Sequence, residues 1–187
     1  MTAEKNPHTI QDNTQKQAQY VIVDTNVLIY AGSKQREKSE AVIRCLEDVV
    51  ATGKLLAISE ITVYEYLRRL WGRKAEEAAE HLKQYERKVV SSEVFSLAAH
   101  LDGLYVEEGI DRVDDADKII AATTILENAL VLTGNHKDFP SPFFVPDTFM
   151  TLPIKSRNYT RHLDLALYRP HFELITRRIS EHDAANS

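Results

Sequence analysis

The hydrophobic residues of this chain follow two patterns that alternate along its length. Short apolar runs, often rich in β-branched residues, are typical of buried parallel strands, whereas apolar residues spaced three or four positions apart form one face of a helix. The first pattern predicts strands at residues 20–23, 55–58, 129–133 and 143–145. The second predicts helices at residues 37–52, 59–71, 75–88, 93–108 and 114–128. Because strands alternate with helices, we expect an α/β fold, with a mainly parallel central sheet covered by helices on both faces.

The same patterns divide the chain into three parts. Residues 1–19 are polar and have few large apolar groups, so we expect a disordered leader. Residues 20–150 form the predicted α/β domain. Residues 151–187 carry too many large apolar side chains for a free tail, which predicts a C-terminal helical extension, with Pro170 separating two short helices. We expect this extension to pack on the same domain or on the mate of a homodimer, and less readily to occupy a groove of a different protein.

Composition narrows the function classes. The sequence lacks an apolar run long enough to span a membrane and a signal-peptide core, so we expect a cytoplasmic protein with no membrane partner. Cys45 is the single cysteine, which excludes an internal disulfide framework, and its apolar neighbours predict a core position. The net charge of −5 argues against a protein that coats nucleic acid by bulk attraction, but not against a nuclease whose clustered carboxylates bind metal ions.

Several acidic residues fall where an open parallel sheet forms its sites, at the carboxyl ends of strands or at the starts of the following helices. Asp24 directly follows the first strand, Glu65 lies near the start of the helix after the second, and Asp117 lies near the start of another helix. Asn135 and Asp138 follow the strand that ends at Thr133. Carboxylates gathered at one edge repel one another unless cations neutralise them, and Mg²⁺ or Mn²⁺ prefers such oxygen ligands.

Each acid also has a structural alternative. Asp24 can cap a following helix, and Glu65 can pair with Arg69 one helical turn away. Asp117 shares its helix N-terminus with two other acids, Asp114 and Asp115, which the helix macrodipole favours there. Asp138 is also an ordinary turn residue.

Four ordered segments resemble the motifs of PIN domains. Val21 to Tyr30 is similar to the opening motif, in which a strand delivers the first metal-binding Asp, here Asp24. Ile58 to Leu67 resembles the second motif and selects Glu65 over Glu60. The segments 117–123 and 132–139 resemble the third and fourth motifs, and the third selects Asp117. The resemblance covers about Tyr20 to Phe149 and is closest to the VapC-like group, ribonuclease toxins of toxin–antitoxin pairs.

The resemblance implies a PIN-like three-layer α/β/α fold and a metal-dependent endoribonuclease that uses Mg²⁺ or Mn²⁺. It implies Asp24 and Asp117 as the main metal ligands, completed by Glu65, with Asp138 as the fourth catalytic acid. Many relatives carry an Asp where this chain has Asn135, which leaves the fourth position open. It also implies RNA as substrate and an antitoxin as a partner. Residues that orient water or phosphate would be Thr25, Asn26, Thr133 and Asn135.

Basic residues near these motifs have two interpretations. They can hold phosphates of the RNA beside the acidic cluster, or they can be solvated cations at a helix C-terminus. The residues in question are Arg68, Arg69, Arg73, Lys74 and Lys137. The alternative to an enzyme is a PIN-fold module that binds RNA or a protein with little or no cleavage. A phosphatase is disfavoured because no Asp-x-Asp pair follows the first strand, and the sequence has no P-loop.

Overall fold

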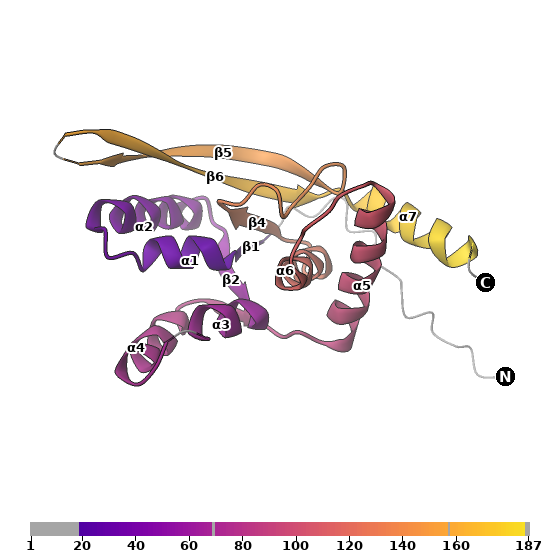
Figure 1. The fold of residues 1–187 in the computed structure, drawn as a ribbon, viewed down its shortest axis with the longest axis horizontal. Coiled ribbons are helices and arrows are strands. Elements are labelled where there is room, and N and C mark those ends of the chain that lie inside the picture. Colours follow the sequence, from indigo (N-terminus) through magenta and orange to yellow (C-terminus); the bar gives the residue numbers. More distant parts are fainter. Residues whose placement is uncertain (1–18, 69, 157, 186–187) are drawn as a thin grey trace.

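A computed structural model describes residues 19–185 except Arg69 and Arg157, so nearly all of the predicted leader lies outside the described residues. The described chain forms one six-stranded sheet in the order β3-β2-β1-β4-β6-β5 (Figure 1). The strands are β1 (Tyr20–Val23), β2 (Leu55–Ser59), β3 (Glu86–Lys88), β4 (Leu130–Thr133), β5 (Phe144–Lys155) and β6 (Thr160–Pro170). The first four pair in parallel, whereas β6 runs antiparallel to both β4 and β5.

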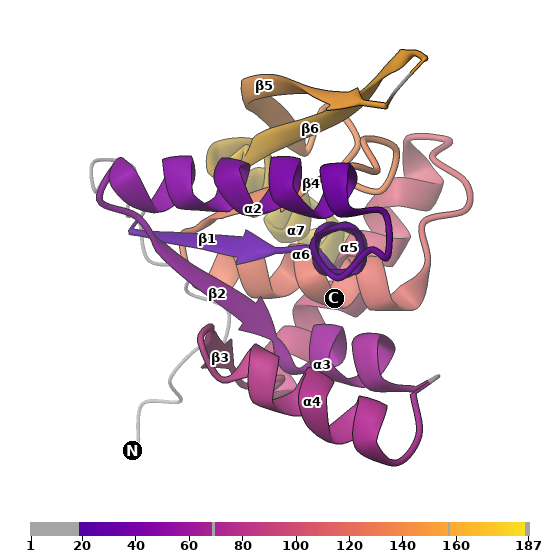
Figure 2. The ribbon, with the colours of Figure 1, turned by 90° about the vertical axis from the view of Figure 1, so that its left-hand side faces the viewer.

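Helices cover both faces of the sheet, as expected for a three-layer α/β/α domain. Side chains of α1 (Thr25–Ala31), α2 (Arg36–Ala51) and α4 (Arg73–Leu82) contribute to the core on one face, and in the view of Figure 2 α2 lies above β1 with its axis nearly aligned with the strand. Those of α5 (Ser92–Glu107), α6 (Asp115–Leu126) and α7 (Phe172–Ala185) contribute to the core on the other. Successive side chains of a strand point to opposite faces, so Ile22 joins one core while Val21 and Val23 join the other.

Most predicted elements are present, with three local differences. Helix α1 was not predicted, because its seven residues are too few to show a helical period. The helix predicted at 75–88 ends at Leu82, and its last residues form the short edge strand β3. The helix that carries Glu65, α3 (Glu60–Leu67), stops before Trp71, whose side chain is 84% exposed. Cys45 is buried in the core, as predicted.

The prediction of a helical extension is wrong for residues 151–170. These residues continue β5 and form β6, so the boundary placed after residue 150 falls inside a strand. The reason is visible in the sequence: Leu163, Leu165 and Leu167 recur every second residue, which is the period of a strand. All three lie in or against the core that α2 covers. Ending the chain at Pro153 would therefore remove a strand that is hydrogen-bonded to β4, rather than a separate extension.

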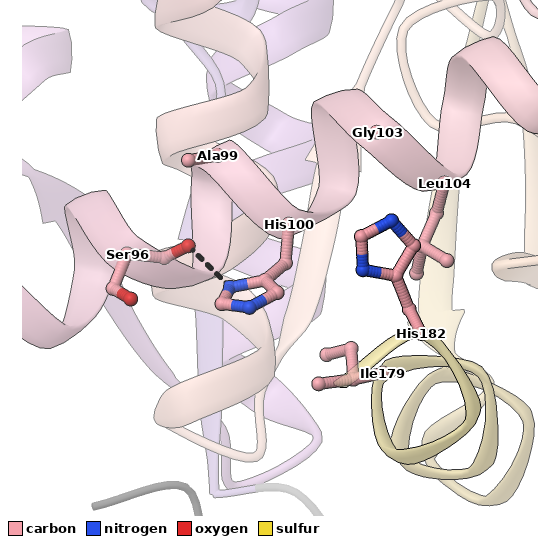
Figure 3. A pocket seen from close by; sticks show the side chains of 7 residues that line it. All are labelled: Ser96, Ala99, His100, Gly103, Leu104, Ile179 and His182. Atoms are coloured by element: carbon pink, nitrogen blue, oxygen red, sulfur yellow. Dashed lines mark hydrogen bonds between the residues drawn. The ribbon is translucent and has the colours of Figure 1, made fainter. Parts of the chain in front are cut away.

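The C-terminal helix α7 docks on α5. Ile175 and Ile179 are buried in the core, and the Arg178 guanidinium contacts the carboxylates of Glu107 and Glu108 at 3.0 and 2.6 Å. A small pocket of about 210 Å³ remains between the two helices, where His100 bonds the Ser96 carbonyl at 2.8 Å (Figure 3). None of the described helices combines the length and the apolar character that crossing a bilayer requires.

Candidate active site

The first acid of the site lies where two central strands end side by side. Asp24 follows β1, and its amide donates to the carbonyl of Leu132 in β4 at 3.0 Å. Its carboxylate is almost fully buried and accepts hydrogen bonds from Thr133 Oγ1, at 2.6 Å, and from Asn26 Nδ2. Asp24 occupies the N-cap position of α1, yet its side chain makes no capping hydrogen bond. Its side chain is instead tied across the sheet to Thr133, the last residue of β4.

Asn26 joins the start of α1 to the loop after β4. Its amide group donates to Thr133 Oγ1 at 3.1 Å, and its side-chain oxygen accepts from the backbone amide of Gly134 at 2.9 Å. A Cβ at Gly134 would stand 3.0 Å from the Tyr30 ring and 3.3 Å from the Asn26 oxygen, so a side chain there would crowd this contact. The predicted supporting residues Asn26 and Thr133 thus fix the orientation of Asp24.

Glu65 reaches the same edge from α3. Its Oε2 accepts a hydrogen bond from Thr25 Oγ1 at 2.7 Å, and its Oε1 lies 4.0 Å from the Arg68 guanidinium. The alternative partner, Arg69, lies outside the described residues. Ser59, which precedes α3, has its hydroxyl 3.1 Å from that of Thr123 in α6, so the helices carrying Glu65 and Asp117 are tied together.

Asp117 and Asp138 complete the cluster. Asp117 lies in the first turn of α6, after the N-cap residue Asp114, whose side chain makes no capping hydrogen bond. Asp138 lies in the turn after β4, is buried, and accepts a hydrogen bond from Asn135 Nδ2. Each of the two carboxyl groups influences the pKa of the other. A turn residue and a helix-start residue are thus brought to the same pocket.

All four predicted catalytic acids line one pocket of about 220 Å³. It is also lined by Thr25, Asn26, Ile29, Arg68 and Asn135. Thr133 contributes to the pocket indirectly, through the hydrogen bond that it donates to the Asp24 carboxylate. Ile29, 53% exposed, was missed because it lies on α1, the helix that the sequence pattern did not predict.

The predicted basic residues, unlike the acids, do not all lie at the pocket. Among those that the structure describes, Arg68 is the one that lines the pocket. Arg73 and Lys74 begin α4 rather than ending α3, and Arg73 lies 3.3 Å from Glu77. The interpretation of these two as cations at a helix C-terminus is therefore wrong. Lys137 is exposed beside Asp138, and its positive charge favours ionisation of that carboxyl group.

Burial and like charges shift the ionisation of this cluster. Burial, reinforced by the charges of Asp138, Asp24 and Glu65, raises the pKa of Asp117 to about 8. Burial also raises the pKa of Asp24 to about 6, although the hydrogen bond from Thr133 opposes the shift. The pKa of Asp138 is raised by burial as well. The protein without a bound cation therefore tends to keep protons at this site.

The donor set fits a hard divalent cation. Its contacting atoms are carboxylate oxygens, the ligands that Mg²⁺ and Mn²⁺ prefer, and a cation would relieve the repulsion that raises these pKa values. Among the described residues, no three His, Cys, Asp or Glu side chains already stand in ligand positions around one point. Asp24, Asp117, Glu65 and Asp138, which line the same pocket, are the residues that would hold such an ion.

The acidic pocket lies at the carboxyl ends of parallel strands, where open α/β sheets bind their ligands. The family model of the PIN domain matches residues 21–141, more than half of the chain. The chain therefore belongs to the PIN domain family, whose members are generally nucleases. No curated protein sequence matches the chain significantly.

Solved structures of similar fold come from bacterial complexes. A toxin-antitoxin complex from Klebsiella pneumoniae is 25% identical, with 65% of this chain and 92% of that chain covered and a TM-score of 0.50. VapBC2 from Rickettsia felis, bound to a DNA fragment from its promoter, is 24% identical, with 64% and 90% covered and a TM-score of 0.52. FitAcB from Neisseria gonorrhoeae is 22% identical, with the same coverage and TM-score. About a third of this chain therefore lies outside these similarities.

The first test removes one charge from the metal-free cluster. Folding raises the pKa of the Asp117 carboxyl group from its ordinary value of about 4 to about 8. A group whose pKa is raised by folding makes the folded state less stable as pH increases between these two values. We expect Asp117→Asn, which cannot ionise, to melt at least about 3 °C above wild type at pH 8.5 in EDTA, and the gap to shrink at pH 5.

The matched control is Asp115→Asn in the same helical turn, because the Asp115 side chain is 95% exposed. Both substitutions remove one favourable charge from the N-terminus of α6, and Asp115→Asn also removes an exposed ion pair with Lys118, which contributes little. A higher melting temperature of Asp117→Asn than of Asp115→Asn therefore reports mainly the buried cluster. Equal melting temperatures for the two variants at pH 8.5 would contradict the like-charge repulsion described above.

Proposed function

We propose that this protein is a divalent-metal-dependent endoribonuclease that uses Mg²⁺ or Mn²⁺. The observation that carries the proposal is the convergence of Asp24, Glu65, Asp117 and Asp138 on one pocket, with raised carboxyl pKa values that a cation would reverse. Four carboxylates without a cation would repel the phosphates of a nucleic acid. With a cation, the same pocket attracts them.

In this proposal Asp24 and Asp117 are the main ligands, and Glu65 completes the cluster through the metal or a bound water. The ion would lower the pKa of a water molecule and offset the charge that develops on the phosphate. The protein's part is to hold the ligands still: Thr133 and Asn26 orient Asp24, and Thr25 orients Glu65. Arg68, at the pocket wall, is placed to bind a phosphate oxygen.

We assign the fourth position to Asp138 rather than to Asn135. The amide of Asn135 donates to the Asp138 carboxylate, so Asn135 positions the acid instead of replacing it. A neutral amide is also a poorer ligand for a hard cation than a carboxylate. Asp138 lines the same pocket as Asp117, so the two residues could share an ion.

The proposal predicts metal-dependent cleavage of RNA. Purified protein should cut a mixed pool of single-stranded RNA in Mg²⁺ or Mn²⁺ and not in EDTA. Asp24→Asn should lower the rate on the order of 100-fold or more, because it removes a charged ligand from the ion that stabilises the transition state. Asp115→Asn, an exposed acid one turn from the site, should cleave like wild type.

Two results would contradict the enzyme assignment. One is cleavage that survives intact in Asp24→Asn, which would point to a contaminating nuclease. The other is RNA binding by wild type without cleavage at any metal concentration, which would favour the alternative of a PIN-fold binding module.

We further propose that the protein acts in the cytoplasm as the toxin of a toxin–antitoxin pair, with an antitoxin protein as partner and a homodimer as its assembly. The support is its membership of the PIN domain family and its likeness to the Klebsiella pneumoniae chain, solved in a toxin-antitoxin complex. The structural match covers 92% of the Klebsiella pneumoniae chain.

Growth arrest tests the toxin assignment. Induced expression of wild type in a bacterial host should slow growth within one generation, because uncontrolled cleavage of RNA stops protein synthesis. Asp24→Asn, expressed to the same level, should not. Equal growth of the two strains would remove the toxin assignment while leaving the nuclease assignment to the assay in vitro.

A further inference from the structure

The β5–β6 hairpin extends past the rest of the sheet. The last pairs between β4 and β6 join Leu132 to Leu167 and Thr133 to Ala166, after which β4 ends. The hairpin continues to the pair Lys155–Thr160, six residues further along β6, or about 20 Å at the usual rise of a strand. Figure 1 shows its tip reaching beyond the end of α2. We call residues 149–165 the hairpin arm.

The arm extends in the direction of the candidate active site. Strand β4 runs parallel to β1, so both end at the edge where Asp24 and the Asp138 turn lie. Because β6 is antiparallel to β4, its residues before Ala166 lie beyond that same edge. The arm also falls outside residues 21–141, the part that the PIN family model matches. It is thus an addition to the domain on the side of the pocket.

Charge on the outer half of the arm is opposite to that of the whole protein. The sequence from Pro153 to Leu163, PIKSRNYTRHL, contains basic residues and no Asp or Glu, whereas the chain carries a net charge of −5. Lys155 and Arg161 are exposed, and neither is ion-paired to a carboxylate within the described part of the chain. The Arg161 guanidinium lies over the Tyr159 ring, 4.8 Å from its centroid. These cations are therefore available to an anionic partner.

The inner end of the arm offers an exposed aromatic surface close to the pocket. Phe149 is 65% exposed, and its ring lies 6.0 Å from that of His136 and 6.4 Å from that of Tyr168. His136 directly follows Asn135, which lines the pocket. A large aromatic side chain left exposed beside a candidate site is a platform on which a nucleic-acid base can stack.

We propose that the hairpin arm binds single-stranded RNA and guides it to the carboxylate pocket, with Phe149 stacking on a base and Lys155 and Arg161 binding phosphates. This inference rests on the proposed ribonuclease function. Two cations on neighbouring strands near the tip, with the exposed Phe149 ring between them and the pocket, match the alternation of phosphates and bases in a single strand. An acidic protein would use the cations but has no comparable use for the stacking surface.

The test measures binding separately from cleavage. In an Asp24→Asn background with Mg²⁺, the affinity for a fluorescent 20-nucleotide single-stranded RNA is followed by anisotropy as salt is varied. Lys155→Ala/Arg161→Ala should weaken binding about 5-fold or more and reduce the slope of log affinity against log salt by about 1.4, the value for two phosphate contacts. Phe149→Ala should weaken binding by a similar factor without changing the slope.

The matched control is Lys83→Ala/Arg177→Ala, which removes the same charge from α4's C-cap and from α7, at side chains 68% and 66% exposed. It should bind like the parent protein. With Asp24 restored, the arm variants should cut the 20-mer more slowly yet cut a dinucleotide at the wild-type rate, because a dinucleotide is too short to reach the arm.

Unchanged RNA affinity in the arm variants, or an equal loss in the control, would overturn the proposal. So would a change in mass by light scattering with RNA affinity unaffected, since the arm would then be an interface between copies. These outcomes are separable from failure of the nuclease assignment, in which wild type cuts no RNA whatever the arm binds.

Discussion

Like-charge repulsion within one small pocket is the constraint on which the rest of this structure depends. Asp24, Glu65, Asp117 and Asp138 come from four separate segments and meet at one edge of the sheet, where burial and mutual repulsion raise the pKa values of the three aspartates. The fold has to hold these groups together against their own charges. Without a cation the raised pKa values of the three aspartates favour their protonated forms, and a bound cation would make the pocket attract phosphate.

The surrounding structure supplies the forces that hold the cluster. Parallel pairing of β1 with β4 places Asp24 beside Thr133, and Asn26 ties the two strand ends together. Two apolar cores, one on each face of the sheet, fix the helices that deliver Glu65 and Asp117. Neutral hydroxyl and amide groups then orient each acid without cancelling its charge. The packing of the two apolar cores thus brings the acidic residues to one edge of the sheet, and hydrogen bonds then orient their side chains.

The sequence predicted the residues of the candidate site better than it predicted the C-terminal strands. Asp24 follows from an apolar run, because hydrophobic patterning determines where parallel strands end. A helix start narrowed the third acid to Asp114, Asp115 or Asp117, and the family resemblance then selected Asp117. The distinction between Glu65 and Glu60 came from family resemblance alone. The β6 strand was missed because Leu163, Leu165 and Leu167 sit close to Tyr168 and Phe172, so the apolar density resembled a helix and obscured the two-residue period. Ile29 and the Asn135–Asp138 contact depend on tertiary packing, which no local pattern contains.

The most direct measurement is the position of Mn²⁺ in a crystal of the wild-type protein, located by its anomalous scattering. The account predicts a peak in the pocket within about 2.1 Å of carboxylate oxygens of Asp24 and Asp117, with Glu65 and Asp138 drawn toward it. The same experiment on Asp117→Asn should show a weaker peak or none. A saturating Mn²⁺ soak that leaves the pocket without a peak, or that places the ion on other residues, would contradict the account.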